Sequence, residues 1–107
     1  MTELAALSRQ ADGVYALRGE LRFATVIPLL RNSGQMFEDG TEAIVVDLIG
    51  VTLVDSAGLS LLIQWWRQAL AAGRTISYTH LPQQMLSMAR LGGVDELLPL
   101  ADTRSEA

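Results

Sequence analysis

Apolar and polar residues alternate along several short segments of this chain, a pattern typical of β-strands with one buried face. The predicted strand segments cover residues 4–11, 14–21, 43–48 and 75–81, and the alternation is found in 14–21 and 75–81. Asp12-Gly13 separates the first two segments and favours a tight turn, so we expect them to form a hairpin. The third segment, A-I-V-V-D-L, is almost continuously apolar, which predicts a central strand covered on at least one face.

Three other segments have the apolar spacing and the end signals of helices. Thr25 is the expected N-cap of the first, with Pro28 in its first turn. The second runs from about Ser56 to Ala72, with Gly73 as the residue that ends it, and Pro82 opens the third.

The order strand, strand, helix, strand, helix, strand, helix predicts an α/β fold: a single mixed sheet of four to five strands with helices packed on it. A chain of 107 residues, half of them apolar, is the size of one compact domain. We therefore expect a single domain over residues 1–107, with an ordered core over about 4–100 and a flexible tail at 101–107.

The helix predicted from Ser56 carries two apolar stripes, and the pattern assigns one to the core and one to the surface. The stripe expected to pack on the sheet contains Leu59, Leu62, Ile63, Trp66 and Leu70. The stripe expected to face solvent contains Ala57, Leu61, Trp65, Gln68 and Ala72. An outward Leu61–Trp65 pair would form a partner-binding patch. The alternative is that Trp65 is covered by the N-terminal segment or by the last helix.

Ser56 is the candidate functional residue, because D-S-A-G-L places its hydroxyl at the start of a helix. Either Asp55 or Ser56 can act as an ordinary helix cap. A phosphate or a partner's acceptor at Ser56 would also meet the positive end of the helix dipole. The predicted partner-binding residues are Asp55, Ser56, Ala57, Gly58, Leu61, Trp65 and Gln68.

Composition argues against catalysis and against nucleic-acid binding. The net charge is −4, and the Arg residues are scattered rather than clustered. The chain contains neither Lys nor Cys, and its one histidine, His80, lies far in sequence from Ser56. We expect no catalytic residue, no cofactor and no metal site. No apolar run approaches the length of a membrane span, and no signal peptide begins the chain, so we expect a cytosolic protein without direct membrane insertion.

Three motifs together resemble the STAS domain, the fold of anti-sigma factor antagonists and of sulfate-transporter tails. They are V-V-D-L-x-x-V-x-x-V-D-S-A-G-L, the strand that follows A-A-G-R, and the helix that ends in L-G-G-V-D-E-L-L. Within this family, the segments W-W-R-Q-A-L-A-A-G-R and L-P-Q-Q-M-L-S-M-A-R are similar to the MlaB branch.

The resemblance implies a non-catalytic cytosolic subunit that binds and regulates an ABC-transporter ATPase, MlaF-like, beneath an MlaE-like permease and an MlaD-like subunit. Such a complex maintains outer-membrane phospholipid asymmetry from the inner face of the inner membrane. The family's hydroxyl site corresponds to Ser56, where MlaB proteins commonly have Thr. Because anti-sigma factor antagonists use Ser as phosphoacceptor, the alternative is an antagonist regulated by phosphorylation of Ser56.

Overall fold

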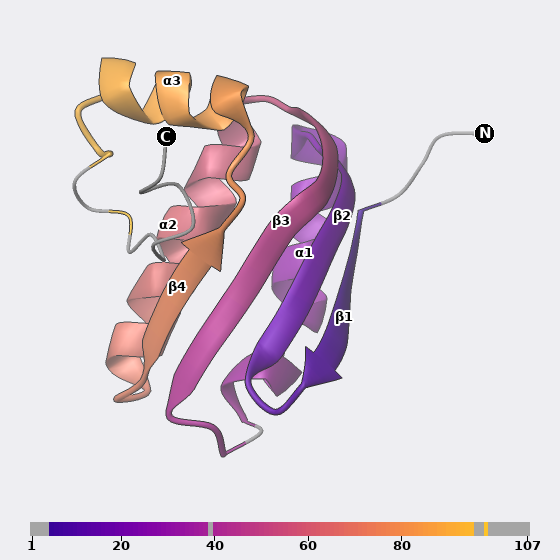
Figure 1. The fold of residues 1–107 in the computed structure, drawn as a ribbon, viewed down its shortest axis with the longest axis vertical. Helices are drawn as coiled ribbons and strands as arrows, with labels where there is room; N and C mark the ends of the chain where they lie inside the picture. The colour runs from indigo at the N-terminus through magenta and orange to yellow at the C-terminus, as the bar shows by residue number, and fades with distance from the viewer. Residues whose placement is uncertain (1–4, 39, 96–97, 99–107) are drawn as a thin grey trace.

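The computed structural model describes residues 5–38, 40–95 and 98, which form one four-stranded sheet with helices packed on it (Figure 1). The predicted tail at 101–107 lies outside the described residues. In chain order the elements are β1 (Ala6–Ala11), β2 (Val14–Leu21), α1 (Phe23–Asn32), the 3₁₀ helix η1 (Gly34–Phe37), β3 (Ala43–Val54), α2 (Ser56–Ala71), β4 (Thr75–Thr79) and α3 (Gln83–Leu91).

The strand order is β1-β2-β3-β4, antiparallel between β1 and β2 and parallel in the other two pairs. Parallel neighbours require crossover connections, and α1 and α2 supply them. Both helices lie behind the sheet in Figure 1, while α3 crosses its upper end. The predicted α/β fold with a mixed sheet is confirmed.

The hairpin between β1 and β2 turns at Gly13, as its sequence predicts. Gly13 has φ = 73°, a conformation that L side chains adopt with strain. A Cβ atom there would lie 2.5 Å from Cγ2 of Thr41 and 2.6 Å from the carbonyl oxygen of Ala43. Only glycine fits this turn without displacing its neighbours.

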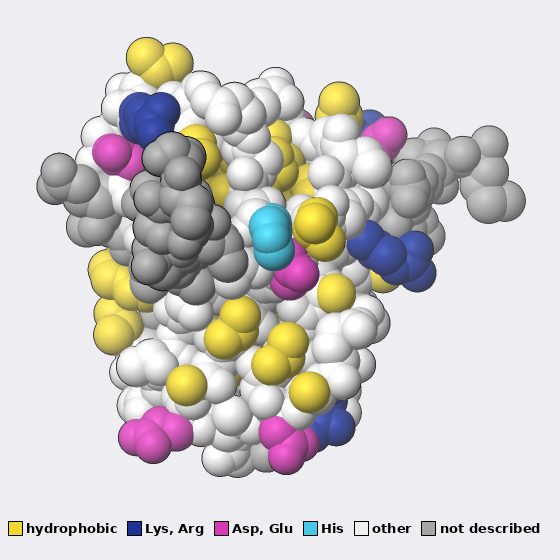
Figure 2. Space-filling view, in the orientation of Figure 1, with side chains coloured by type: hydrophobic (Ala, Val, Ile, Leu, Met, Phe, Trp, Pro, Cys, Tyr) yellow, Lys and Arg dark blue, Asp and Glu magenta, His cyan; other side chains and the backbone are white. Residues whose placement is uncertain are grey.

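The sheet is covered by helices on one face. Along β3, Ile44, Val46 and Leu48 are buried, whereas Val45 and Asp47, which point the other way, are half-buried. The uncovered face is shown in Figure 2, where apolar side chains appear singly among polar ones. One-sided burial explains the alternation that the sequence shows in β2 and β4.

β3 is longer than its sequence indicates. The segment from Ile49 to Val54, which the sequence pattern leaves as a loop, continues the strand and pairs in parallel with β2 up to Leu21. Gly50 permits the close pairing, since a Cβ atom there would lie 2.9 Å from Cβ of Arg18. The long strand carries the chain to the start of α2.

α1 begins two residues before the predicted cap. Arg22 is the N-cap, and Thr25 lies at the third helical position, where its Oγ1 accepts a hydrogen bond from the Arg22 N–H at 2.9 Å and donates to the Glu20 carbonyl at 2.6 Å. Pro28 is therefore inside the helix, beyond the first turn. The earlier start brings Phe23 into α1.

Candidate functional site

Asp55 fixes the start of α2 at the end of β3. Its N–H donates to the Leu21 carbonyl at 3.0 Å, which ties this corner to β2. Its carboxylate accepts the Ala57 N–H at 2.8 Å, and its carbonyl accepts the Gly58 N–H at 3.0 Å. Asp55 is thus the helix cap, and the exposed Ser56 beside it does not serve that role.

The structure divides the predicted partner-binding residues into two groups. Asp55, Ser56 and Gln68 are exposed, and Ala57 is half-buried. Gly58, Leu61 and Trp65 are buried, and Trp65 has no exposed surface at all. The prediction of an outward Leu61–Trp65 patch is wrong, and Gly58 also faces the interior.

Two contacts account for the burial of this side of α2. The Trp65 indole N–H donates to Oγ of Ser33 at 2.9 Å, and that hydroxyl donates to the Leu30 carbonyl at 3.1 Å, so the only polar atom of the indole is satisfied in the core. A Cβ atom at Gly58 would lie 3.0 Å from Cβ of Leu21. The missing side chain lets this side of the helix approach the sheet closely.

The stripe predicted to pack on the sheet lies instead at the margin of the core. Leu59, Ile63 and Trp66 are half-buried, and Leu70 is 59% exposed. Only Leu62 of this set is fully buried, where its carbonyl accepts a hydrogen bond from the Tyr78 hydroxyl at 2.7 Å. Tyr78 is itself buried, and this burial raises the pKa of its hydroxyl.

An apolar hollow of about 390 Å³ adjoins Ser56. Its lining residues come from the first turns of two helices: Phe23, Val26 and Ile27 of α1, with Asp55, Ser56, Ala57 and Ser60 at the start of α2. Phe23 is 71% exposed and Ile27 39% exposed. Sequence reasoning missed Phe23 because it started the helix after Thr25, and it placed Ile27 on that helix without assigning it to a site; their spacing of four positions was the available signal.

A second hollow, of about 400 Å³, continues along α2. It is lined by Ser60, Ile63, Gln64 and Arg67, and Ser60 is common to both hollows. We call the first hollow, which has residues of both helices, the α1–α2 groove; the second is lined by α2 alone.

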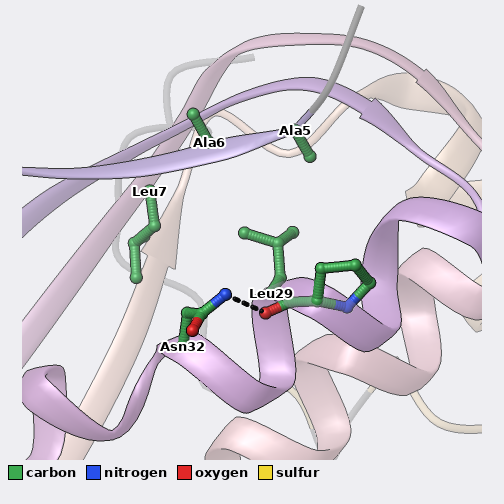
Figure 3. Close-up of a pocket in the computed structure, with 6 residues that line it drawn as sticks. Ala5, Ala6, Leu7, Leu29 and Asn32 are labelled. Carbon is green, nitrogen blue, oxygen red and sulfur yellow. Dashed lines mark hydrogen bonds between the residues drawn. The ribbon is translucent and has the colours of Figure 1, made fainter.

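Another hollow, of about 250 Å³, lies between β1 and α1 (Figure 3). Ala5, Leu7 and Leu29 give it apolar walls, and the Asn32 side-chain N–H donates to the Pro28 carbonyl at 2.9 Å. Its one amide side chain is thus used within α1. Nothing in this hollow resembles a reactive or charged site.

His80 pairs with Asp47 on the open face of the sheet, where the cyan histidine lies beside an acidic side chain in Figure 2. Nδ1 of His80 is 2.9 Å from Oδ1 of Asp47. Burial raises the pKa of Asp47, but hydrogen bonds from His80 and from the Ile49 N–H outweigh it, so the pKa lies below its ordinary value. Roughly 20 Å of extended β3 separates this pair from Ser56.

Within residues 5–38, 40–95 and 98, no three His, Asp or Glu side chains gather as a metal site would require. No helix in the same part of the chain has the length and apolar character needed to cross a bilayer.

Comparison with known proteins identifies the fold family. A family model described as the MlaB STAS domain matches residues 5–99. An anti-sigma factor antagonist from Mycobacterium paratuberculosis has a similar structure, with a TM-score of 0.73, 23% identity, and coverage of 98% of this chain and 90% of that one. No curated protein matches the chain in sequence.

Two further solved structures share the fold. A STAS-domain protein from Planctomyces limnophilus gives a TM-score of 0.70 at 16% identity, covering 99% of this chain and 94% of that one. The phosphorylated form of the Bacillus cell fate determinant SpoIIAA gives 0.66 at 18% identity, covering 95% and 94%. At these identities the structural likeness establishes the fold, while the family model covers nearly all of the described core. The chain belongs to the MlaB-type STAS-domain family.

Proposed function

We propose that this chain is a non-catalytic subunit that binds and regulates the MlaF-like ATPase of a phospholipid-transporting ABC complex. The complex would also contain an MlaE-like permease and an MlaD-like subunit, and it would hold the chain at the cytoplasmic face of the inner membrane. The α1–α2 groove, beginning at Ser56, is the proposed contact surface.

One observation carries the proposal: the family hydroxyl site is exposed and adjoins an apolar hollow. Phe23 offers a large aromatic side chain that is mostly in solvent, and it lies in the same hollow as Ser56. Aromatic side chains at the centre of a protein interface commonly dominate its binding energy. The family match to the MlaB STAS domain supports the choice of an ABC-transporter ATPase as partner.

The residues around Ser56 support binding better than catalysis. A nucleophilic serine needs a nearby base, and the single histidine is bonded to Asp47 elsewhere on the sheet. Asp55 is committed to the cap of α2. The hydroxyl is therefore suited to a hydrogen bond with a partner surface.

Co-purification of this chain with a co-expressed MlaF-like ATPase tests the proposal. Ser56→Ala should leave the melting temperature unchanged, since Asp55 makes the cap, and should weaken the complex modestly. Ser56→Glu should weaken it by about tenfold or more, because a carboxylate next to Asp55 must be desolvated against the partner. Ser87→Glu, on the exposed side of α3, is the matched control and should bind as the wild type does.

Failure of the wild-type chain to bind the ATPase would refute the proposal. If Ser56→Glu and Ser87→Glu bind equally well, the ATPase partner stands but Ser56 is outside the contact. Measurement of ATP turnover in the same samples reports regulation separately from binding.

An anti-sigma factor antagonist is the second candidate, favoured by the structural likeness to SpoIIAA in its phosphorylated form. In this case a kinase would phosphorylate the exposed Ser56. The N–H groups of Ala57 and Gly58 are already bound by Asp55, so the phosphate would gain from the helix dipole but be repelled by the neighbouring carboxylate. Specific phosphorylation of Ser56 by a neighbouring kinase, with no binding to an ABC ATPase, would select this function.

A further inference from the structure

The α-helices that cover the sheet contain no carboxylate. Their sequences carry three basic side chains, Arg31, Arg67 and Arg90, and neither Asp nor Glu. No acidic residue occurs between positions 56 and 94, although the whole chain has 12 acidic residues and a net charge of −4. The helical layer therefore has a net positive charge within an acidic protein, and an anionic group of a partner would meet the least repulsion there.

One hollow on this layer brings three hydrogen-bond donors together. The hollow of about 400 Å³ on α2, which we call the α2 hollow, is lined by Ser60, Ile63, Gln64 and Arg67. Ser60, Gln64 and Arg67 follow one another at intervals of four and three positions, so they lie on one side of the helix. A hydroxyl, a carboxamide and a guanidinium can thus donate hydrogen bonds into the same space, and the half-buried Ile63 supplies an apolar wall.

The donors of the α2 hollow are available to a partner. Ser60, Gln64 and Arg67 are exposed, and no side chain of the three forms a hydrogen bond or a salt bridge with another described residue. The nearest acidic residue in sequence, Asp55, precedes Arg67 by twelve positions, which corresponds to about 18 Å along α2. The guanidinium of Arg67 therefore lacks a counter-charge on its own helix and attracts an anion from outside.

We propose that the α2 hollow binds one carboxylate side chain, Asp or Glu, of the partner protein. The guanidinium of Arg67 pairs with this carboxylate, and Ser60 and Gln64 donate hydrogen bonds to its remaining lone pairs. One cation balances one carboxylate, whereas a phosphate group would keep an excess negative charge in this hollow. Ser60 also lines the α1–α2 groove, so the same partner can place an apolar side chain against Phe23 and Ile27.

The inference rests on the proposed function for the identity of the partner, the MlaF-like ATPase, and it specifies the charge that the ATPase presents to α2. Calorimetry with the purified chain and the purified ATPase measures the affinity. Permease and lipid are left out, so that a lipid phosphate cannot supply the anion. Failure of the wild-type chain to bind overturns both ideas, whereas binding that does not respond to charge in the α2 hollow overturns the inference alone.

Opposite substitutions at one position report the sign of the partner's charge. Gln64→Glu places a carboxylate in the α2 hollow and should weaken binding by about tenfold or more, because it competes for Arg67 and repels the partner's carboxylate. Gln64→Lys adds a second cation and should tighten binding by about threefold. Gln84→Glu and Gln84→Lys are the matched controls and should bind as the wild type does, since Gln84 is an exposed glutamine on α3. Misfolding cannot produce a gain of affinity, so weakening by both Gln64 variants, or a change in neither, overturns the inference.

Arg67→Gln removes the charge while keeping an amide donor. It should weaken binding by about fivefold at about 0.05 M salt and by less at about 0.5 M, because salt screens an exposed ion pair. Arg90→Gln is the matched control, an exposed arginine in the last turn of α3, and should keep the wild-type affinity at both salt concentrations. All variants should keep the wild-type melting temperature. Equal weakening by Arg67→Gln and Arg90→Gln reports a general attraction to the helical layer and overturns the inference.

Discussion

Replacement of Trp65 by alanine should destabilise the domain far more than replacement of its neighbour Trp66. Trp65 is 0% exposed, whereas Trp66 is only half-buried. Truncating a fully buried tryptophan typically costs about 3–5 kcal/mol, from lost transfer energy and from the cavity. Trp66→Ala should cost about 1–2 kcal/mol, since it loses less buried area and its site can be filled by solvent.

The hydrogen bond of Trp65 adds a separable contribution. Its indole N–H reaches Oγ of Ser33 at 2.9 Å, and Ser33 is only 2% exposed. Trp65→Phe keeps most of the apolar volume but leaves that hydroxyl without its donor, so we expect a loss of about 1–3 kcal/mol. Ser33→Ala should cost a similar amount, because it leaves the buried N–H unpaired. The double variant should cost less than the two single losses added together.

Urea denaturation followed by far-ultraviolet circular dichroism measures all five variants without relying on tryptophan fluorescence. Fluorescence then provides an independent check, because the chain has only two tryptophans. Trp66→Ala retains the buried indole and should emit at shorter wavelength than Trp65→Phe, which retains the half-exposed one. A larger free-energy loss in Trp66→Ala than in Trp65→Ala would refute the orientation of α2 described above.

Three further predictions concern other parts of the chain. Gly13→Ala should lower the free energy of unfolding by about 2 kcal/mol or more, measured in urea, because its Cβ would meet Thr41 in a left-handed turn. Asp55→Ala should cost about 1 kcal/mol in the same assay through loss of the helix cap. The pKa of Asp47 is lowered in the folded state, so its pair with His80 stabilises the fold above the ordinary pKa of 3.8 and this stabilisation is lost as pH falls below it. Asp47→Asn should therefore reduce the free energy of unfolding at pH 6 but converge with the wild type as pH falls through the lowered pKa of Asp47; a constant difference across the acidic range would contradict the linkage.

Local chemistry was sufficient to predict most of the elements. Asp12-Gly13 predicted the hairpin turn because a left-handed residue is needed there. The candidate capping residues Asp55 and Ser56 predicted the start of α2. Gly73, which has φ = 73°, predicted its end. Pro82 likewise marks the start of α3. Each of these signals acts within a few residues, so the neighbouring sequence is sufficient to determine the turn or the helix end.

The extent of β3 and the start of α1 required the partner strand. The sequence from Ile49 to Val54 has neither regular alternation nor flanking turn residues that would predict a strand. These residues are in β3 because they pair with β2. The sequence around Thr25 predicts a helix cap. In the structure its hydroxyl instead donates a hydrogen bond to the carbonyl of Glu20, near the end of β2. Because α1 begins earlier than predicted, Phe23 lies in its first turn and exposes its side chain.

Tertiary structure alone decided which side of α2 faces the sheet. The helix is apolar over more than half of its circumference, so the sequence specifies the angles between side chains but not the absolute rotation of the helix. Close approach at Gly58 and the hydrogen-bond partner that Ser33 offers to Trp65 select the rotation. Both contacts join residues distant in sequence, since Gly58 meets Leu21 across the core and Ser33 follows α1. The sequence thus determined where the helix and its exposed hydroxyl begin, whereas packing between elements determined which apolar residues lie beside that hydroxyl.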